Sequence, residues 1–188
     1  MPLTDAQRWN QRYLEDERFQ KYIQPKSFLL DHAGLLPAQG IALDVAMGLG
    51  GNAAFLIERG LRVVGVDISD VGLRRAKARL PQLMAVRADL THFSLPSRSF
   101  DLILNFYYLE RSLWPEYRRW LRLGGLVIIE TLLLEMQECQ PHLDPAFLLE
   151  PGELMQAFSD LEILVYREGW ETSAQGHPRA VASLIARL

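Results

Sequence analysis

Cysteine, long apolar runs and a surplus of one charge sign are all missing or scarce in this chain of 188 residues. Cys139 is the single cysteine, which excludes an intramolecular disulfide and fits a reducing compartment. No apolar run approaches the roughly 18 residues that a transmembrane helix needs. Residues 1–20 are too polar for a signal peptide. We therefore expect a soluble, cytoplasmic protein that does not enter a membrane.

Charge and repeats exclude further classes of protein. The formal net charge is −3, so no basic surplus would attract the phosphate backbone of a nucleic acid. The basic run at residues 74–79 lies in a helix-like stretch, where we expect a solvated helix face. The four histidines have no metal-ligand spacing, and the chain has no internal repeat. We expect one domain over residues 1–188 and no metal ion.

The pattern of apolar runs predicts an α/β fold. Short runs rich in β-branched residues alternate with helix-like stretches, which is typical of βαβ units in a doubly wound parallel sheet. The expected strands cover residues 41–45, 61–66, 83–87, 100–104 and 125–134. The expected helices between them cover residues 51–59, 69–80 and about 112–122. Two last strand-like runs, at 161–168 and 180–188, have no helix between them and therefore predict an antiparallel hairpin.

Two helices are expected before the first strand. Thr4 and Gln7 have the spacing of a capping box. Trp9 and Tyr13 lie on one face of the helix that follows it. A second, short helix is expected over residues 27–36.

Glycines gather directly after the first strand, in "IALDVAMGLGGNAAF". Open α/β sheets bind ligands beyond the carboxyl ends of their strands. Gly48, Gly50 and Gly51 would let the backbone approach a ligand there and adopt positive φ. A plain strand-to-helix turn is the alternative.

Acidic residues follow the second and third strands. Asp67 follows Gly48 by 19 residues, close to the roughly 20 at which an acid accepts the ribose hydroxyls of a nucleoside. A helix N-cap is the alternative for Asp67, although Ser69 is the better cap. Asp89 could accept from an adenine amine, while Leu90 adds a backbone N–H and apolar contact. A turn-capping aspartate is the alternative for Asp89.

Asp44, just before the glycines, distinguishes between nucleotide ligands. Its carboxylate would repel a pyrophosphate but attract an ammonium or a sulfonium group. Together with Asp67 and Asp89 it predicts a pocket for a cationic adenosine derivative. S-adenosylmethionine (SAM) is such a molecule.

These residues resemble the class I SAM-dependent methyltransferases. "LDVAMGLG" is similar to the first motif of that family, with Ala46 in place of its first glycine. "GVDIS", "RADL" and "SFDLILNFYYLE" resemble the ribose, adenine and fourth-strand motifs in the family's order. The resemblance covers residues 25–188 and implies a Rossmann-like, seven-stranded sheet of order 3-2-1-4-5-7-6. The cofactor-binding residues that it implies are Asp44, Ala46, Gly48, Gly50, Asn52, Asp67, Ile68, Asp89, Leu90 and Asn105.

A narrower resemblance is to small bacterial methyltransferases of the tellurite-resistance and thiopurine-methyltransferase type. "RWNQRY", "GGNAAFLIERG" and "FLLEPGELMQAFSDLEILVYREG" carry it. In that group an N-terminal helix with a W-x-x-x-Y pair folds over the cofactor, which implies a helical cap at residues 1–24. Trp9 and Tyr13 match the pair and could contact a sulfonium by cation–π attraction, typically about 0.5–2 kcal/mol. An amphipathic helix packed on the core is the alternative. Gly51 stands where relatives often carry arginine, and Met47 where they often carry cysteine.

The residues that would bind the methyl acceptor are harder to identify from the sequence. Methyl transfer from a sulfonium needs mainly an aligned nucleophile and the exclusion of water, so it requires no fixed set of catalytic residues. A soft nucleophile such as a thiol or a selenium or tellurium oxyanion needs no catalytic base. Candidates around the acceptor are Tyr107 and Arg111 after the fourth strand, Glu130 in the fifth, and His142. His142 lies in the irregular segment 135–150, a candidate lid. A salt bridge for Arg111 and a loop histidine without a role are the alternatives.

We therefore expect a SAM-dependent methyltransferase that acts on a small molecule. Two other functions stay open. A non-catalytic SAM-binding sensor or partner protein fits equally well on the cofactor side. An NAD-dependent oxidoreductase is the other, since "GLGGNA" satisfies G-x-G-x-x-A. Asp44 and the lack of a second nucleotide-binding half argue against the oxidoreductase.

Overall fold

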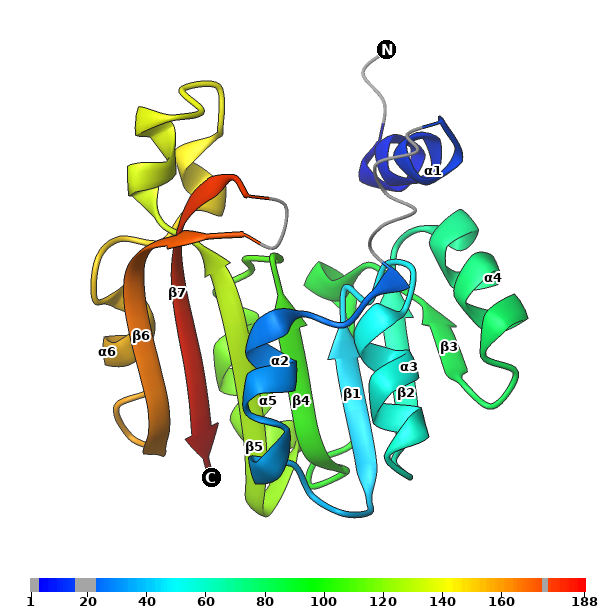
Figure 1. The fold of residues 1–188 in the computed structure, drawn as a ribbon. Helices are drawn as coiled ribbons and strands as arrows, with labels where there is room; N and C mark the ends of the chain where they lie inside the picture. The colour runs from blue at the N-terminus through cyan, green and yellow to red at the C-terminus, as the bar shows by residue number, and fades with distance from the viewer. Residues whose placement is uncertain (1–3, 16–22, 174–175) are drawn as a thin grey trace.

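Seven strands form one sheet in the order β3-β2-β1-β4-β5-β7-β6 (Figure 1). The structure is a computed structural model that describes residues 4–15, 23–173 and 176–188. The strands are β1 (Ile41–Val45), β2 (Arg62–Asp67), β3 (Met84–Arg87), β4 (Phe100–Phe106), β5 (Leu121–Leu132), β6 (Glu162–Thr172) and β7 (Pro178–Arg187). Strands β1 to β5 are parallel, whereas β7 is antiparallel to both β5 and β6. The predicted fold class, strand order and terminal hairpin are confirmed.

Helices cover both faces of this sheet (Figure 1). On one face lie α2 (Ser27–Asp31), α3 (Gly51–Glu58) and α4 (Asp70–Arg79), and on the other lie α5 (Leu113–Trp120) and α6 (Glu153–Ala157). Each face has its own apolar core, built around Phe28 and Leu56 on the first and around Tyr117 and Trp120 on the second. Burial on both faces explains why the central strands are almost continuously apolar.

Several predicted boundaries are confirmed by specific contacts. The Ser69 side chain caps α4 by accepting from the Gly72 N–H at 3.1 Å. The Thr4 N–H donates to Gln7 Oε1 at 2.9 Å, which is one half of the predicted capping box. Both helices therefore begin where the sequence predicts.

Two boundaries differ from the expectation. The short helix predicted over 27–36 is split into α2 and a 3₁₀ turn, η2 (Ala33–Leu35). Strand β5 begins at Leu121, directly after α5, rather than at residue 125. Leu121 is fully buried and pairs with Phe100, and the register then shifts at a bulge in β5 before Leu126 pairs with Leu102, so the strand starts before its glycines.

Ligand-binding elements are expected at the edge of the sheet where β1 to β5 end, here called the carboxyl edge. Helix α1 (Asp5–Glu15) and the segment after β5 both rise above this edge (Figure 1). That segment contains the 3₁₀ turns η4 (Leu134–Glu138) and η5 (Pro145–Phe147), and another, η3 (Leu90–His92), follows β3. Within the described ranges, no helix is long and apolar enough to cross a membrane.

Candidate functional site

The turn after β1 has a left-handed backbone at three positions. Ala46, Gly48 and Gly50 have φ values of 52°, 60° and 74°. The Met47 N–H donates to the Val66 carbonyl at 3.0 Å and so fixes the turn against β2. Ala46, which replaces the family's first glycine, thus keeps a glycine-like conformation that is unfavourable for a residue with a Cβ atom.

Asp67 at the end of β2 anchors this turn. Its Oδ2 accepts from the Gly48 N–H at 2.7 Å and its Oδ1 from the Ser69 N–H at 2.8 Å. Burial raises the pKa of the Asp67 carboxyl, although these N–H donors act to lower it. Each carboxylate oxygen can accept a second hydrogen bond, so Asp67 can hold both the turn and a ligand hydroxyl.

Asp44 in β1 is the polar group in greatest need of a partner. The residue is 2% exposed, and its Oδ2 has no hydrogen-bond partner among the described residues. Burial, and secondarily the negative charge of Asp67, raise the pKa of the Asp44 carboxyl to about 8. Leaving a buried acceptor unsatisfied typically costs about 1–3 kcal/mol. A ligand that brings a cation or a donor to Asp44 would remove this cost.

Helix α1 packs over the glycine turn and the start of α4 (Figure 1). Asn10 Oδ1 accepts from the Ser69 hydroxyl at 2.7 Å and from the Val71 N–H at 3.2 Å. Tyr13 is buried, and a Cβ atom on Gly48 would lie 2.7 Å from its hydroxyl. The Trp9 and Tyr13 rings are 5.7 Å apart, on the shared face that the sequence predicts. Part of the predicted cap over residues 1–24, namely 1–3 and 16–22, lies outside the described residues.

The basic residues of the run at 74–79 are exposed, as expected of a solvated helix face, but two of them also contact the backbone of other elements. Arg74 is exposed and pairs with Asp70. Arg75, however, donates to the Tyr13 carbonyl, and Arg79 donates to the Leu49 carbonyl. This helix face therefore holds both α1 and the glycine turn.

Asp89 is exposed, unlike Asp44 and Asp67. Its Oδ1 accepts from the Thr91 N–H at 3.0 Å and the Thr91 hydroxyl at 2.7 Å, so it caps η3. The neighbouring Leu90 is buried in the core. Ile68, which follows Asp67, is half-buried.

The hydroxyl of Tyr108 lies in the electrostatic range of several acids. Burial, Glu110, Asp89 and Asp67 raise the pKa of the Tyr108 phenol to about 12. Tyr108 follows β4 by two residues, and the charges of Asp67, at the end of β2, and of Asp89, after β3, act on it. The phenol therefore stays protonated at neutral pH.

Asn52 and Asn105 both make contacts within the protein. Asn52 Oδ1 accepts from the Lys26 N–H at 2.9 Å and so holds the segment before α2. Asn105 is 1% exposed and donates to the Tyr117 hydroxyl at 2.8 Å. Asn105 Oδ1 has no partner among the described residues, so it remains available at the end of β4.

Tyr107 follows β4 in a left-handed conformation, with φ of 60°. Its N–H donates to the Glu130 carbonyl at 2.8 Å, and its hydroxyl donates to Glu130 Oε1 at 2.6 Å. Burial and the Glu130 carboxylate raise the pKa of the Tyr107 phenol. Such strain is maintained only where surrounding contacts hold it, and it marks a candidate functional position.

Glu130 connects this position to the terminal hairpin. The residue is fully buried, and its Oε2 accepts from the Ser183 hydroxyl at 2.9 Å and from Arg167 at 3.2 Å. Arg179 approaches its Oε1 to 3.7 Å and also donates to the Tyr107 hydroxyl. The sequence analysis named Glu130 but missed Arg167 and Arg179, because they lie in strands distant in sequence and carry no motif.

Arg111 and His142 lie elsewhere at this end of the molecule. Arg111 donates to the Glu153 carboxylate at 2.5 and 2.9 Å and to the carbonyls of Ala146 and Leu148. These contacts agree with the salt-bridge alternative and tie the 135–150 segment to α6. His142 is exposed in that segment.

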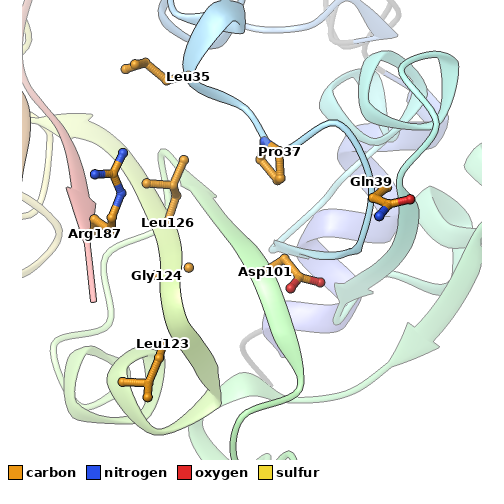
Figure 2. Close-up of a pocket in the computed structure, with 9 residues that line it drawn as sticks. Leu35, Pro37, Gln39, Asp101, Leu123, Gly124, Leu126 and Arg187 are labelled. Atoms are coloured by element: carbon orange, nitrogen blue, oxygen red, sulfur yellow. The ribbon is translucent and has the colours of Figure 1, made fainter.

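A surface pocket of about 240 Å³ lies at the opposite edge of the sheet (Figure 2). It is lined by residues that include Asp101 near the start of β4 and Arg187 at the end of β7. Asp101 Oδ2 already accepts from the Ile41 N–H at 2.8 Å and from Arg122 at 2.7 Å. This pocket is separate from the candidate site at the carboxyl edge.

Comparison with known proteins gives the family context of this geometry. Residues 42–125 match the methyltransferase domain family. A trans-aconitate 2-methyltransferase from Azoarcus sp. is 38% identical over 95 residues, which are 47% of this chain and 37% of that protein. A probable S-adenosylmethionine-dependent methyltransferase from Mycolicibacterium smegmatis is 28% identical over the same coverage. The chain thus matches just over a third of the length of these curated relatives.

Solved structures share the fold over most of the chain. TehB from Haemophilus influenzae aligns with a TM-score of 0.74 and 19% identity, over 92% of this chain and 66% of TehB. A SAM-dependent methyltransferase from Methanosarcina mazei aligns with a TM-score of 0.70 and 16% identity, over 84% of this chain and 96% of that one. At these identities the likeness concerns the fold alone. Residues 42–125, which carry the glycine turn, Asp67, Asp89 and Asn105, therefore match the methyltransferase domain family by sequence, within a fold that known SAM-dependent methyltransferases share.

Proposed function

We propose that this protein is a SAM-dependent methyltransferase that transfers a methyl group to a small-molecule acceptor. The observation that carries the proposal is the buried Asp44 carboxyl, whose Oδ2 has no hydrogen-bond partner among the described residues, beside a glycine turn that Asp67 anchors. A cationic nucleoside would favour the ionised form of Asp44 and offset the cost of burying it, whereas the pyrophosphate of NAD would oppose that ionisation. The family match over residues 42–125 supports the same conclusion.

The residues at the carboxyl edge fit this cofactor. Asp67 would accept from the ribose hydroxyls, and Asp44 would face the cationic end of SAM. The left-handed turn at Gly48 and Gly50 leaves room for backbone approach. Residues 1–24 would cover the cofactor, with Trp9 and Tyr13 near its sulfonium. The remaining residues proposed around it are Ala46, Asn52, Ile68, Asp89, Leu90 and Asn105.

When bound, SAM supplies an activated methyl group on a sulfonium leaving group. The chain's own tasks are then binding, orientation and the exclusion of water. Tyr107 does not serve as a base, because its proton is held at Glu130 Oε1 and its pKa is raised. We assign no catalytic role to Arg111, whose guanidinium is occupied by Glu153 and two carbonyls. An acceptor that is already nucleophilic fits this lack of a base.

Two different chemical classes of methyl acceptor each have one line of support. The shared fold with TehB, together with the motifs of the tellurite-resistance type, supports a soft nucleophile such as a thiol or a selenium or tellurium oxyanion. Two relatives are named trans-aconitate 2-methyltransferases, which supports an organic acid. Under both, the acceptor is a small molecule, and we propose neither a nucleic acid nor a membrane as a partner.

The first test is calorimetric titration with SAM, S-adenosylhomocysteine and NAD. We expect SAM and S-adenosylhomocysteine to bind, and binding of NAD without SAM would overturn the proposal. Asp67→Ala should weaken SAM binding at least about tenfold, or about 1.4 kcal/mol. Asp70→Ala, which removes a half-buried acid in the same stretch that pairs with the exposed Arg74, should leave the affinity unchanged. If Asp67→Ala fails to fold, Asp67→Asn tests the same lost charge with the side-chain size kept.

Turnover separates an enzyme from a SAM-binding sensor. We would follow S-adenosylhomocysteine release with thiols, selenite, tellurite, trans-aconitate and small amines. SAM binding without turnover on any of these acceptors would favour the non-catalytic alternative.

A further inference from the structure

A second buried acceptor without a partner, Asn105 Oδ1, lies near the end of β4. The side chain is 1% exposed, and this oxygen accepts no hydrogen bond from the described residues. An unsatisfied buried acceptor is costly, and native proteins rarely leave one without a donor. Asn105 therefore needs a hydrogen-bond donor that the described part of the chain does not supply.

Asn105 lies beside the start of the glycine turn, on the opposite face of the sheet from Asp44. In the register of β1 and β4, Asn105 is opposite Val45, the last residue of β1. Val45 belongs to the apolar core around Tyr117, and successive side chains of a strand point to opposite faces. Asp44 thus points the other way, toward α3, whose Ala53 N–H acts to lower its pKa. A cofactor bound across the turn would lie close to both acceptors.

Tyr117 of α5 holds the Asn105 side chain in one orientation. Its hydroxyl accepts from Asn105 Nδ2 at 2.8 Å, and both side chains are buried. Tyr117 is itself fixed by its surroundings, since it is 0% exposed and its ring centroid is 6.1 Å from that of Trp120. Burial raises the pKa of the Tyr117 phenol, which therefore stays protonated. Because Nδ2 is bound to this hydroxyl, the amide oxygen is turned away from it.

We infer that Tyr117 is a positioning residue, which holds Asn105 so that its Oδ1 accepts a hydrogen bond from the bound cofactor. This inference rests on the proposed function and extends the cofactor site to a residue of α5. A neutral amide oxygen suits an uncharged N–H or O–H donor, whereas the acid Asp44 suits the cationic end of the cofactor. Without the Tyr117 hydroxyl the amide can turn and present its N–H groups, which cannot accept from a donor.

Tyr117→Phe tests this inference, because it removes the hydroxyl and keeps the ring. We expect S-adenosylhomocysteine to bind the folded variant at least about threefold more weakly, as measured by titration calorimetry. Tyr166→Phe is the matched control, since Tyr166 lies in β6 and its hydroxyl contacts Glu168, and it should leave the affinity unchanged. An unchanged affinity in Tyr117→Phe would overturn the inference alone. If S-adenosylhomocysteine does not bind the wild type, the proposed function fails and this inference fails with it.

A double-mutant cycle separates positioning from a merely structural role of Tyr117. Asn105→Leu removes the acceptor at nearly constant size and should weaken S-adenosylhomocysteine binding at least about fivefold. In that background Tyr117→Phe should weaken binding no further, because Tyr117 acts through Asn105. Equal losses from Tyr117→Phe in both backgrounds, or an unchanged affinity in Asn105→Leu, would overturn the inference. If Asn105→Leu fails to fold, Asn105→Ala replaces it, with the same expected and the same overturning results.

Discussion

At the scale of single residues, Asp44 shows how a site can be recognised by what it lacks. A buried carboxyl normally has hydrogen-bond partners, yet Asp44 Oδ2 has none among the described residues. The neighbouring Asp67 is equally buried but accepts from two backbone N–H groups. Both oxygens of Asp67 are therefore satisfied by the fold, whereas Asp44 Oδ2 is not, which supports the proposal that Asp44 faces the cofactor.

Asp44 also predicts how stability depends on pH. Its pKa in the folded protein, about 8, lies above its ordinary value of 3.8. Between about pH 4 and pH 8 the unfolded chain therefore loses this proton while the folded protein keeps it, so stability falls as the pH rises. Asp44→Asn should flatten this fall and raise the free energy of unfolding at pH 8 by about 1–3 kcal/mol. Urea denaturation at several pH values measures both effects.

The matched control is Asp31→Asn, an exposed acid at the end of α2. It should keep the pH dependence of the wild type. A wild-type slope in Asp44→Asn would mean that Asp44 is ionised in the folded protein and already has a partner. The same variant should lose at least about tenfold in SAM affinity, so that stability and binding change in opposite directions.

Residues differ in how far the sequence reveals them. The site acids Asp44 and Asp67 could be predicted because strand ends and a spacing of 19 residues identify them. Lys26 and Arg179 could not, since they lie near opposite ends of the chain and meet only over the Tyr107 ring. No local pattern encodes a contact of that kind.

At the scale of elements, the first turn of α3 is the support for the segment that enters α2. A Cβ atom on Gly51 would lie 2.4 Å from the Gln24 carbonyl oxygen and 2.9 Å from the Ile23 carbonyl carbon. The adjacent Asn52 accepts from the Lys26 N–H. This close backbone packing explains why Gly51 stands where relatives often carry a larger residue, and it places Lys26 over Tyr107.

Gly51→Ala should therefore destabilise the protein. The clash is with backbone atoms that cannot rotate away, and overpacking of this kind typically costs about 1–3 kcal/mol. Gly34→Ala is the control, because a Cβ atom there meets nothing within 4 Å, and its effect should stay within about 0.5 kcal/mol. Thermal unfolding compares the two variants. Equal midpoints for both would show that residues 23–24 do not pack on α3 in solution.

The sequence predicts the order of the strands but not the start of β5, for physical reasons. The order of the sheet follows from the alternation of apolar strands with crossover helices, a long-range signal repeated along the chain. The start of β5 was missed because Trp120 ends α5 and Leu121 begins the strand without an intervening turn residue. Gly124 and Gly125 lie inside the strand near its start, where Gly124 has a left-handed φ of 76°, and they do not mark its boundary.

At the scale of the whole molecule, the two sides of the site come from different parts of the chain. The proposed cofactor side is built largely from residues 44–105, inside the segment that matches the methyltransferase domain family. The buried Glu130 and its partners Arg167, Arg179 and Ser183 lie in β5, β6 and β7, almost entirely beyond residue 125. Sequence comparison therefore identifies the cofactor more readily than the acceptor.

Helix α1 packs on α4 and on the glycine turn, and its attachment to α4 can be tested separately. Asn10→Ala removes an acceptor for the Ser69 hydroxyl and the Val71 N–H. A lost hydrogen bond of this type costs about 1 kcal/mol. If α1 covers the cofactor, SAM affinity should fall about fivefold. Titration calorimetry with SAM measures the change.

Gln11→Ala is the control on the same helix, because Gln11 is exposed and contacts Glu15. It should leave SAM affinity unchanged. An undiminished affinity in Asn10→Ala would show that the docking of α1 does not contribute to cofactor binding, and would favour the alternative of a helix that only packs on the core.

The position of β7 between β5 and β6 has a consequence for the order of folding. Strands β1 and β2 pair between residues 21 apart in sequence, whereas β5 and β7 pair between residues 49 to 61 apart. Pairings that close longer loops are slower because they cost more chain entropy. We expect the half of the sheet that carries Asp44 and Asp67 to become ordered first, and the wall containing Arg179 and Ser183 to be completed last. A folding intermediate would then be competent to bind the nucleoside before it could select an acceptor.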